Sequence, residues 1–348
     1  MNVLFKNAVL LRTLLATAVQ IAEPDNDHSW ELIEDARSRG FIPYRELTEA
    51  ENERWRELKP LVDEAPVPDA REEYLLYQTL LGIWPLTGGI TAELIQRLQD
   101  YLHKALREAK LHSSWLNPHE EYEQAVNTFL ERILAAESDF LTDFAEFQAP
   151  IAQAGLFNSL AQTLLKITSP GVPDFYQGTE LWNFSLVDPD NRRPVDYARR
   201  QELLASLQRV STLTELLAQP TDDRVKLWLT ARALAFRQQH RELFERGSYI
   251  PLSTQGERED QVIAFARQLG EASVLVLTGR FFTQFPALPN GDAWGDTTVI
   301  VPEQLAGCYR EVLSRRNLCL EQRGQQQVLP LAKAFLNGPF ALLAAAPP

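Results

Sequence analysis

The sequence SPGVPDFYQGTELWNFSLVDPDNRRPVD, residues 169–196, separates two parts of the chain with different patterns. Its prolines and glycines are typical of a fixed loop, and they occur together with Asp, Arg, Tyr and Trp. Before it, apolar residues recur every three or four positions, which predicts helices. After about residue 247, short β-branched runs alternate with turn residues, which predicts strands. Helices first and strands last favour two domains over one mixed sheet.

Residues 1–167 are predicted to be almost wholly helical, and residues 59–71 are predicted to be a proline-rich, acidic loop. Thr91 is a candidate N-cap, and Asn117-Pro118 is a candidate helix start. One short apolar run within residues 164–176 predicts a buried strand. The predicted helices cover residues 73–83, 90–106, 122–134, 140–147, 199–218 and 224–240, and the predicted strands cover 261–266, 273–278, 297–301 and 340–345.

Composition excludes several classes of function. The net charge of −13 disfavours a nucleic-acid partner, since phosphate binding needs a basic surface. No run of about 18 apolar residues is present, so no membrane span is expected, and residues 9–21 favour an amphipathic helix over a signal-peptide core. Cys308 and Cys319, with five scattered histidines, predict neither a disulfide framework nor a metal site. A reducing cytoplasm is therefore the expected location.

The central stretch has the residue types of a carbohydrate site. Asp and Arg side chains can hydrogen-bond to hydroxyls, and aromatic faces can stack on sugar rings. The alternative is a structural loop in which Asp188, Asp190, Arg192 and Arg193 satisfy one another. The residue types alone leave both interpretations open.

Two motifs within this stretch resemble known enzymes. Residues 171–180 are similar to the "G-x-P-x-x-Y-x-G-x-E" pattern of α-amylase-type enzymes, and DPDNRRPVD at residues 188–196 resembles maltooligosyl trehalose synthases. Residues 72–85 (EEYLLYQTLLGIWP), 104–118 (KALREAKLHSSWLNP) and 294–297 (WGDT) also resemble that family. The resemblance extends from about Tyr74 to Pro302.

The resemblance implies a fold and a reaction. The fold is a partial (β/α)₈ barrel with a large helical insertion subdomain (1–167), a last barrel strand, active-site loop and closing helices (168–245), and a C-terminal antiparallel β-sandwich (246–348). The last strand would be residues 169–176 and the active-site loop residues 177–196. The implied reaction is an isomerase's intramolecular transglucosylation of a maltooligosaccharide, which converts the reducing-end α-1,4 bond to an α,α-1,1 bond. No cofactor and no metal are implied.

The resemblance also implies substrate-binding residues in the loop and in a helical lid. For the lid, the alternative is a packed helix with a satisfied histidine and a core tryptophan. The implied residues are Tyr176, Gln177, Glu180, Trp182, Asp188, Asp190, Asn191, Arg192, Arg193, Lys110, His112, Ser114 and Trp115.

The catalytic carboxylates of the family are not recognised in this chain. The nucleophile's "G-x-R-x-D" strand motif and the general acid are expected upstream of it. Residues 34–39 resemble part of the third carboxylate's motif, which makes Asp35 or Asp27 a candidate, although a solvated charged helix is the alternative. The chain is therefore expected to be inactive alone, or to need a complementing N-terminal half. The rival hypotheses are a non-catalytic glucan-binding remnant and an amylase-like hydrolase, and residues 188–196 argue against the hydrolase.

Overall fold

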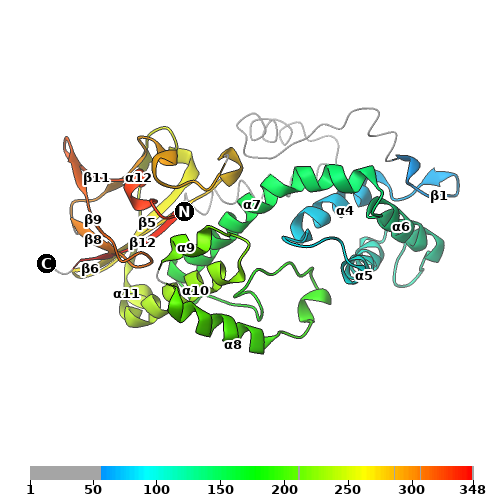
Figure 1. Ribbon diagram of the computed structural model, residues 1–348, viewed down its shortest axis with the longest axis horizontal. Coiled ribbons are helices and arrows are strands. Elements are labelled where there is room, and N and C mark those ends of the chain that lie inside the picture. The colour runs from blue at the N-terminus through cyan, green and yellow to red at the C-terminus, as the bar shows by residue number, and fades with distance from the viewer. Residues whose placement is uncertain (1–55, 211, 286, 306, 347–348) are drawn as a thin grey trace.

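The computed structural model describes residues 56–210, 212–285, 287–305 and 307–346. The predictions for residues 9–21, Asp27 and Asp35 lie outside these residues. The described chain is elongated, with a helical lobe at one end, antiparallel sheets at the other and the long helix α7 between them (Figure 1). None of the described helices combines the length and the apolarity needed to cross a membrane.

The helical lobe has the helices that the three- and four-residue periodicity predicts. Thr91 caps α5 by accepting a hydrogen bond from the Leu94 N–H, as expected, and Asp69 caps α4 in a capping box with Glu72. Helix α6 begins at Glu120, later than the predicted start at Asn117-Pro118. The helices are α4 (Ala70–Ile83), α5 (Ala92–Ala109), α6 (Glu120–Ile133) and α7 (Asp139–Thr168).

The predicted loop at residues 59–71 contains a short hairpin instead. Strands β1 (Leu61–Val62) and β2 (Ala65–Pro66) pair antiparallel. Asp63 and Glu64 connect them with φ values of 51° and 67°. Two consecutive left-handed residues are what a tight hairpin turn requires, so this segment is an ordered edge of the lobe.

The predicted strand at residues 169–176 is wrong. Helix α7 continues to Thr168, and the described residues between Thr168 and β3 contain no strand. A barrel strand is defined by hydrogen bonds to parallel neighbours, and the described residues supply no such neighbour here. The apolar run that suggested a strand is partly the buried face of α7, which includes Leu164 and Ile167.

The helix predicted at residues 199–218 is divided in two. Val210 and Thr212 are extended, and both are β-branched residues, which favour extended backbone. The helix predicted at residues 224–240 is confirmed as α10. The helices of this region are α8 (Tyr197–Ser206), α9 (Leu213–Leu217), α10 (Asp223–Gln239) and α11 (Arg241–Arg246).

The C-terminal part forms two antiparallel sheets. One has the order β3-β5-β6-β12-β8-β9 and the other β10-β11-β7-β4. The four predicted strands are confirmed as β5, β6, β7 and β12, whereas β3, β4 and β8 to β11 were not predicted. The strands are β3 (Ser248–Pro251), β4 (Thr254–Gln255), β5 (Val262–Leu269), β6 (Ala272–Gly279), β7 (Thr298–Val301), β8 (Cys308–Glu311), β9 (Asn317–Cys319), β10 (Glu321–Arg323), β11 (Gln326–Pro330) and β12 (Phe340–Ala345).

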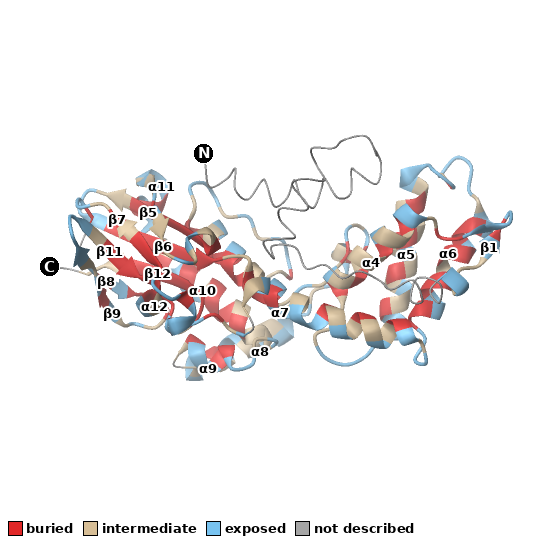
Figure 2. Cartoon of the chain, turned by 90° about the horizontal axis from the view of Figure 1, so that it is seen from above, coloured by how far each residue is buried: buried red, intermediate tan, exposed pale blue. Residues whose placement is uncertain are grey.

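The central strands β5, β6 and β12 of the six-stranded sheet are buried on both faces (Figure 2). In β6, Val274 and Val276 join an apolar cluster with α7 and α10, whereas Leu275 and Leu277 join a second cluster with strands of the other sheet. Successive residues of a strand point to opposite faces. The continuous apolar run of β6 therefore reflects two packed faces rather than one.

Arg267 of β5 ties the helices to this sheet. Only 1% of the residue is exposed. Its guanidinium donates to the carbonyl oxygens of Thr168 (3.3 Å), Phe244 (2.9 Å), Gly247 (2.8 Å) and Ser248 (3.2 Å). Thr168 ends α7 and Phe244 lies in the last turn of α11, where carbonyl groups lack helical partners and the helix dipole is negative. Burial lowers the pKa of Arg267, with nearby Arg237 acting in the same direction.

No disulfide framework was predicted, but Cys308 and Cys319 form a disulfide. They lie directly opposite each other on β8 and β9, with their Cα atoms 4.0 Å apart. The sequence separation of 11 residues could not reveal this pairing, because β8 and β9 were not predicted.

Cys308→Ser is expected to lower the free energy of unfolding by about 3 kcal/mol, because the crosslink restricts a short loop in the unfolded chain. Guanidinium unfolding of the oxidised protein with and without a thiol reductant measures the effect. The variant should match the reduced parent and should not respond to the reductant. Equal stability of the oxidised and reduced parent would contradict the prediction.

Candidate functional site

The loop at residues 177–196 reaches across to helix α5 of the helical lobe (Figure 1). The Arg97 Nε and Nη2 atoms donate to the two carboxylate oxygens of Asp190, each at 2.8 Å, and Nη2 also donates to the Phe184 carbonyl at 2.8 Å. Arg193 pairs with Glu93 at 3.0 Å. The loop is therefore fastened to α5 by charged side chains of both segments.

Asp190 is the centre of this attachment. It is 8% exposed, and it also accepts a hydrogen bond from the Leu186 N–H at 2.7 Å. Burial alone would raise the pKa of Asp190, but hydrogen bonds from Arg97 and the Leu186 N–H outweigh it and lower the pKa, with Arg193 adding to the effect. Asp190 is therefore a stable carboxylate that positions the loop.

Asp188 makes a second, more exposed attachment. Its carboxylate lies 3.2 Å from the Lys104 Nζ and 2.5 Å from the Arg192 Nε, and Lys104 also donates to the Asp188 carbonyl at 2.9 Å. If the stretch were only a structural loop, four of its charged residues were expected to pair among themselves, and they do so in part. These residues are Asp188, Asp190, Arg192 and Arg193. The partners on α5 were missed. These partners are Glu93, Arg97 and Lys104, and their spacing of four and seven residues places them on one face of the helix. This spacing is the signal in the sequence that could have revealed the partners.

Glu180 and Trp182 hold the base of the loop. Glu180 accepts a hydrogen bond from the Arg200 Nε at 2.5 Å, and Arg200 also donates to the Gly178 carbonyl at 3.0 Å. The Trp182 indole N–H donates to the Asp222 carbonyl at 3.2 Å, and its ring packs against the apolar cluster around α7 and α10. Both residues are thus engaged with protein groups, and sugar binding by them stays a prediction.

Tyr176, just before the loop, and two residues of the loop have side-chain groups without a protein partner among the described residues. Tyr176 is 47% exposed, and Gln177 is also exposed. The Oδ1 atom of Asn191 is buried and accepts no hydrogen bond from the described residues. The exposed Tyr176 and Gln177 side chains are therefore available to an added ligand, whereas the Asn191 oxygen is buried.

The predicted lid residues lie in and after the last turn of α5. Lys110 ends the helix in the left-handed conformation, with φ of 58°. The Oγ atom of Ser114 accepts a hydrogen bond from the Asn117 N–H at 3.0 Å. The Trp115 ring is 54% exposed and lies 5.1 Å from the Arg107 guanidinium carbon. The alternative of a core tryptophan is therefore wrong, because Trp115 presents an aromatic surface to solvent.

His112 belongs to a polar cluster that joins α4 to α6. Its Nε2 atom lies 3.0 Å from the Asp69 carboxylate, and its ring stacks on Tyr122 at 4.5 Å between centroids. The Tyr122 hydroxyl donates to Glu72, whose pKa is raised by burial. The Asp69, Glu72 and His112 ligand atoms lie within 4.8 Å of one another, but Asp69 also caps α4. His112 is satisfied by protein partners, as the structural alternative expected.

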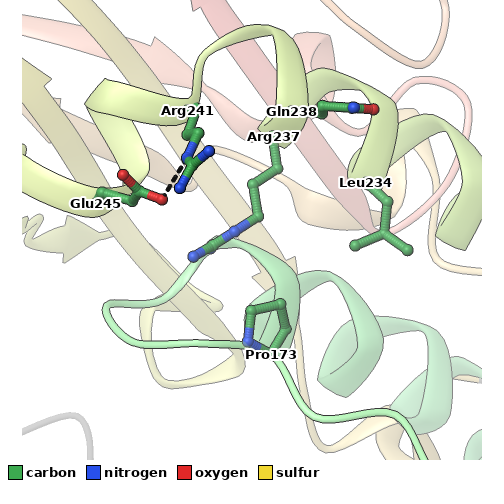
Figure 3. Close-up of a pocket in the computed structure, with 6 residues that line it drawn as sticks. All are labelled: Pro173, Leu234, Arg237, Gln238, Arg241 and Glu245. Carbon is green, nitrogen blue, oxygen red and sulfur yellow. Dashed lines mark hydrogen bonds and ion pairs between the residues drawn. The ribbon is translucent and has the colours of Figure 1, made fainter.

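A shallow pocket of about 360 Å³ borders the first part of the central stretch (Figure 3). Arg237 donates to the Ile167 and Gly171 carbonyls, and Arg241 pairs with Glu245 at 2.6 Å. Pro173 is its only lining residue from the central stretch, and none of the predicted substrate-binding residues lines it. Since Arg237 and Arg241 are both bonded to protein groups, we interpret this pocket as a packing gap between α10, α11 and the start of the central stretch.

The letters G-x-R-x-D do occur in the sequence, as GERED at residues 256–260. They form the turn between β4 and β5. The Arg258 backbone N–H donates to the Thr297 Oγ1 at 3.0 Å. Gly256 has a φ of 117° and lies close to the Thr297 backbone, so a side chain would not fit there. This copy is a tight turn fastened to the WGDT segment, and it is not the end of a barrel strand.

The helical lobe, bridging loop and antiparallel sheets are similar to parts of several solved structures. Among solved structures, maltooligosyltrehalose synthase from Arthrobacter ramosus matches 79% of this chain with a TM-score of 0.63 and 32% identity. A Sulfolobus tokodaii structure described as a hypothetical maltooligosyl trehalose synthase matches 89% of it with a TM-score of 0.61 and 28% identity. A Mycobacterium tuberculosis protein that bears the name maltooligosyl trehalose synthase is 40% identical over 203 residues, or 58% of this chain. No protein-family model matches the chain.

The chain is thus a relative of the maltooligosyl trehalose synthases over part of their length. The matched region spans 24% of the Mycobacterium tuberculosis protein and 32% of the Arthrobacter ramosus chain. The resemblance expected from the central stretch is therefore confirmed, together with its partial extent.

Proposed function

We propose that this chain is part of a maltooligosyl trehalose synthase and supplies glucan-binding surface rather than bond-breaking groups. The supporting observation is that sequence and structure neighbours both bear the name of this enzyme. The reaction would convert the reducing-end α-1,4 bond of a maltooligosaccharide to an α,α-1,1 bond without a cofactor.

In the complete enzyme, the described helices and strands would belong to a barrel and a β-sandwich. Helix α7, the central stretch and α10 would belong to the wall of a (β/α)₈ barrel. The two antiparallel sheets, which share an apolar cluster, would be the C-terminal β-sandwich. In such barrels the active site lies at the loops that follow the strands, which is the place of residues 177–196.

Retention of configuration needs a nucleophilic carboxylate and a protonated carboxyl group across the scissile bond. In the described part of the loop, the side chains of Glu180, Asp188 and Asp190 are ion-paired with arginine or lysine. Their carboxylate oxygens are thus occupied by protein donors rather than left for a scissile bond. The chain alone would therefore lack turnover and would need a complementing N-terminal half.

The exposed groups would contact the sugar. Trp115 offers a ring face with Arg107 beside it, and Tyr176 and Gln177 offer a second aromatic ring and an amide. Trp182 would stabilise the loop rather than bind sugar, because its N–H already donates a hydrogen bond to the Asp222 carbonyl.

Incubation of the purified chain with maltopentaose tests this function. We expect the reducing-end signal to stay constant, while titration calorimetry detects binding. Trp115→Ala should weaken that binding about fivefold, since an aromatic face contributes about 1 kcal/mol. Leu336→Ala, which removes an exposed apolar side chain of the sheet lobe, is the matched control and should bind normally.

The two hypotheses within this family separate in the same experiment. Binding without turnover, followed by appearance of α,α-1,1 linkages when the catalytic half of a relative is added, supports a complementing enzyme part. Binding that never yields turnover favours a non-catalytic glucan-binding protein. Loss of reducing ends with the chain alone would overturn the proposal that it lacks the catalytic groups, and absence of binding would overturn both.

A further inference from the structure

Glu123 of α6 is a buried carboxylate whose partners come from two other segments of the helical lobe. Only 7% of the residue is exposed. One carboxylate oxygen accepts a hydrogen bond from the Arg107 Nε at 2.8 Å, and the other accepts one from the Arg107 Nη2 at 2.9 Å. The Ser113 hydroxyl donates to the first oxygen, and the His103 Nε2 lies 3.2 Å from the second. Glu123 therefore gathers side chains from α5 and from the connection between α5 and α6.

Two of these partners also contact the Trp115 ring. The guanidinium carbon of Arg107 lies over the ring at 5.1 Å from its centroid. The His103 ring meets the Trp115 ring edge to face, with centroids 5.9 Å apart and planes at 69°. Both contacts are attractive, since the face of an aromatic ring carries negative charge and its edge positive charge. Trp115 nevertheless stays 54% exposed, so its ring is held on the α5 side and open to solvent elsewhere.

The backbone that carries Trp115 depends on the same carboxylate. The Ser113 Oγ, which donates to Glu123, also accepts a hydrogen bond from the His119 N–H at 3.0 Å. Ser113 is 4% exposed and lies two residues before Trp115, so these bonds fix the start of the connection. Glu123 thus acts on Trp115 twice, on the ring through Arg107 and on the backbone through Ser113.

The pairing of Glu123 with Arg107 defines a geometry more than it adds stability. Desolvation of a buried ion pair offsets much of its attraction. A two-pronged bond between a guanidinium and a carboxylate fixes both groups in one plane. Hydrogen bonds from Arg107 lower the pKa of Glu123 against the effect of burial, and the Ser113 hydroxyl adds to them. Glu123 is therefore a permanent carboxylate that orients its neighbours.

We propose that Glu123 is a positioning residue of the glucan-binding site, because through its partners it holds the exposed Trp115 ring in place to stack on the C–H face of one glucose unit. The inference rests on the proposed function, which supplies the maltooligosaccharide as the ligand of Trp115. A ring that is already fixed loses little rotamer freedom when a sugar stacks on it. Release of the ring would weaken binding although Glu123 itself does not touch the sugar.

Fluorine NMR of the full chain labelled with fluorotryptophan tests the positioning without any sugar. The chain has seven tryptophans, and the resonance that is absent from Trp115→Phe identifies Trp115. Glu123→Gln keeps the size of the side chain and removes its charge. In this variant the Trp115 resonance should move toward that of free fluorotryptophan, because the ring is released into water. Glu121→Gln, at an exposed position of the same helix, is the matched control and should leave the resonance unchanged.

Titration calorimetry with maltopentaose then tests the effect on the ligand. Glu123→Gln should weaken binding by up to about fivefold, which is the loss expected for Trp115→Ala. The double variant of Glu123→Gln and Trp115→Ala should bind no more weakly than Trp115→Ala alone, because Glu123 acts through the missing ring. A merely structural role of Glu123 would weaken binding further in the double variant.

Ser113→Ala gives a milder second variant, because it keeps the ion pair between Arg107 and Glu123. It should move the Trp115 resonance in the same direction by a smaller amount, and it decides the question where Glu123→Gln does not fold. An unmoved Trp115 resonance in both variants, or additive losses in the double variant, would overturn the role of Glu123 and leave the proposed function standing. A parent that does not bind maltopentaose would instead overturn the proposed function, and with it the sugar as the ligand of Trp115.

Discussion

Arg267→Met is expected to lower the free energy of unfolding by about 3–5 kcal/mol, since a buried charged donor is lost while its acceptors stay buried. Four carbonyl oxygens, from Thr168, Phe244, Gly247 and Ser248, would lose their hydrogen bonds together. Methionine has a similar length, so the loss would come from the missing donors rather than from an open cavity.

Urea unfolding followed by tryptophan fluorescence measures this loss. Arg246→Met, which removes an exposed arginine of α11, is the matched control and should change the stability by no more than about 0.5 kcal/mol. Arg267→Lys should be intermediate, because an ammonium keeps the charge but cannot reach all four carbonyls. A loss below about 1 kcal/mol in Arg267→Met would contradict the role of Arg267 as the link between helices and sheet.

The sequence pattern predicted helices and strands correctly where the buried residues recur at a single regular spacing. Helices α4 to α6 show apolar residues at helical spacing, and β5, β6, β7 and β12 show compact β-branched runs. The predicted end of β5 at residue 266 was too early, because Arg267 looks like a surface residue. Its burial depends on two helix ends that are distant in the sequence, and no local pattern contains that information.

The elements that were missed or wrong depend on partners. Strand β8 has a buried residue at every second position and β9 has only Leu318 buried, so neither forms a compact apolar run. The strand at residues 169–176 was expected from the family resemblance, but Pro170, Gly171 and Pro173 disfavour a strand, and a strand also needs neighbours to pair with.

The candidate site was located by its residue types, but the roles of its members were not. Asp, Arg and aromatic residues in a loop suit both sugar binding and mutual pairing, and composition cannot distinguish the two. The structure decides the contacts of Asp190, because Arg97 lies 93 residues away in the sequence yet donates to both carboxylate oxygens. Trp115 shows the opposite case, since a core tryptophan was the alternative to a substrate-binding role and the residue is exposed.

Asp190→Asn is the second substitution with a large expected effect. The neutral amide cannot pair with both Arg97 and Arg193, and the Arg97 side chain, only 17% exposed, would keep a poorly compensated charge. We expect the free energy of unfolding to fall by about 2–3 kcal/mol. The loop should also become more sensitive to proteases between residues 177 and 196, because its attachment to α5 is weakened. Asp188→Asn is the matched control and should cost less than about 1 kcal/mol, since Asp188 and Arg192 are more exposed.

The pH dependence gives this prediction a second measurement. Because the folded-state pKa of Asp190 lies below its ordinary value of 3.8, its contribution to stability is fully present above that value and is lost as the pH falls through the folded pKa. The stability difference between the parent and Asp190→Asn should therefore stay constant near neutral pH and shrink in acid below about pH 4. A difference that stays the same down to the acid unfolding transition would show that the carboxylate's charge does not stabilise the loop. A difference absent at neutral pH would remove Asp190 as the residue that fastens the loop to the helical lobe.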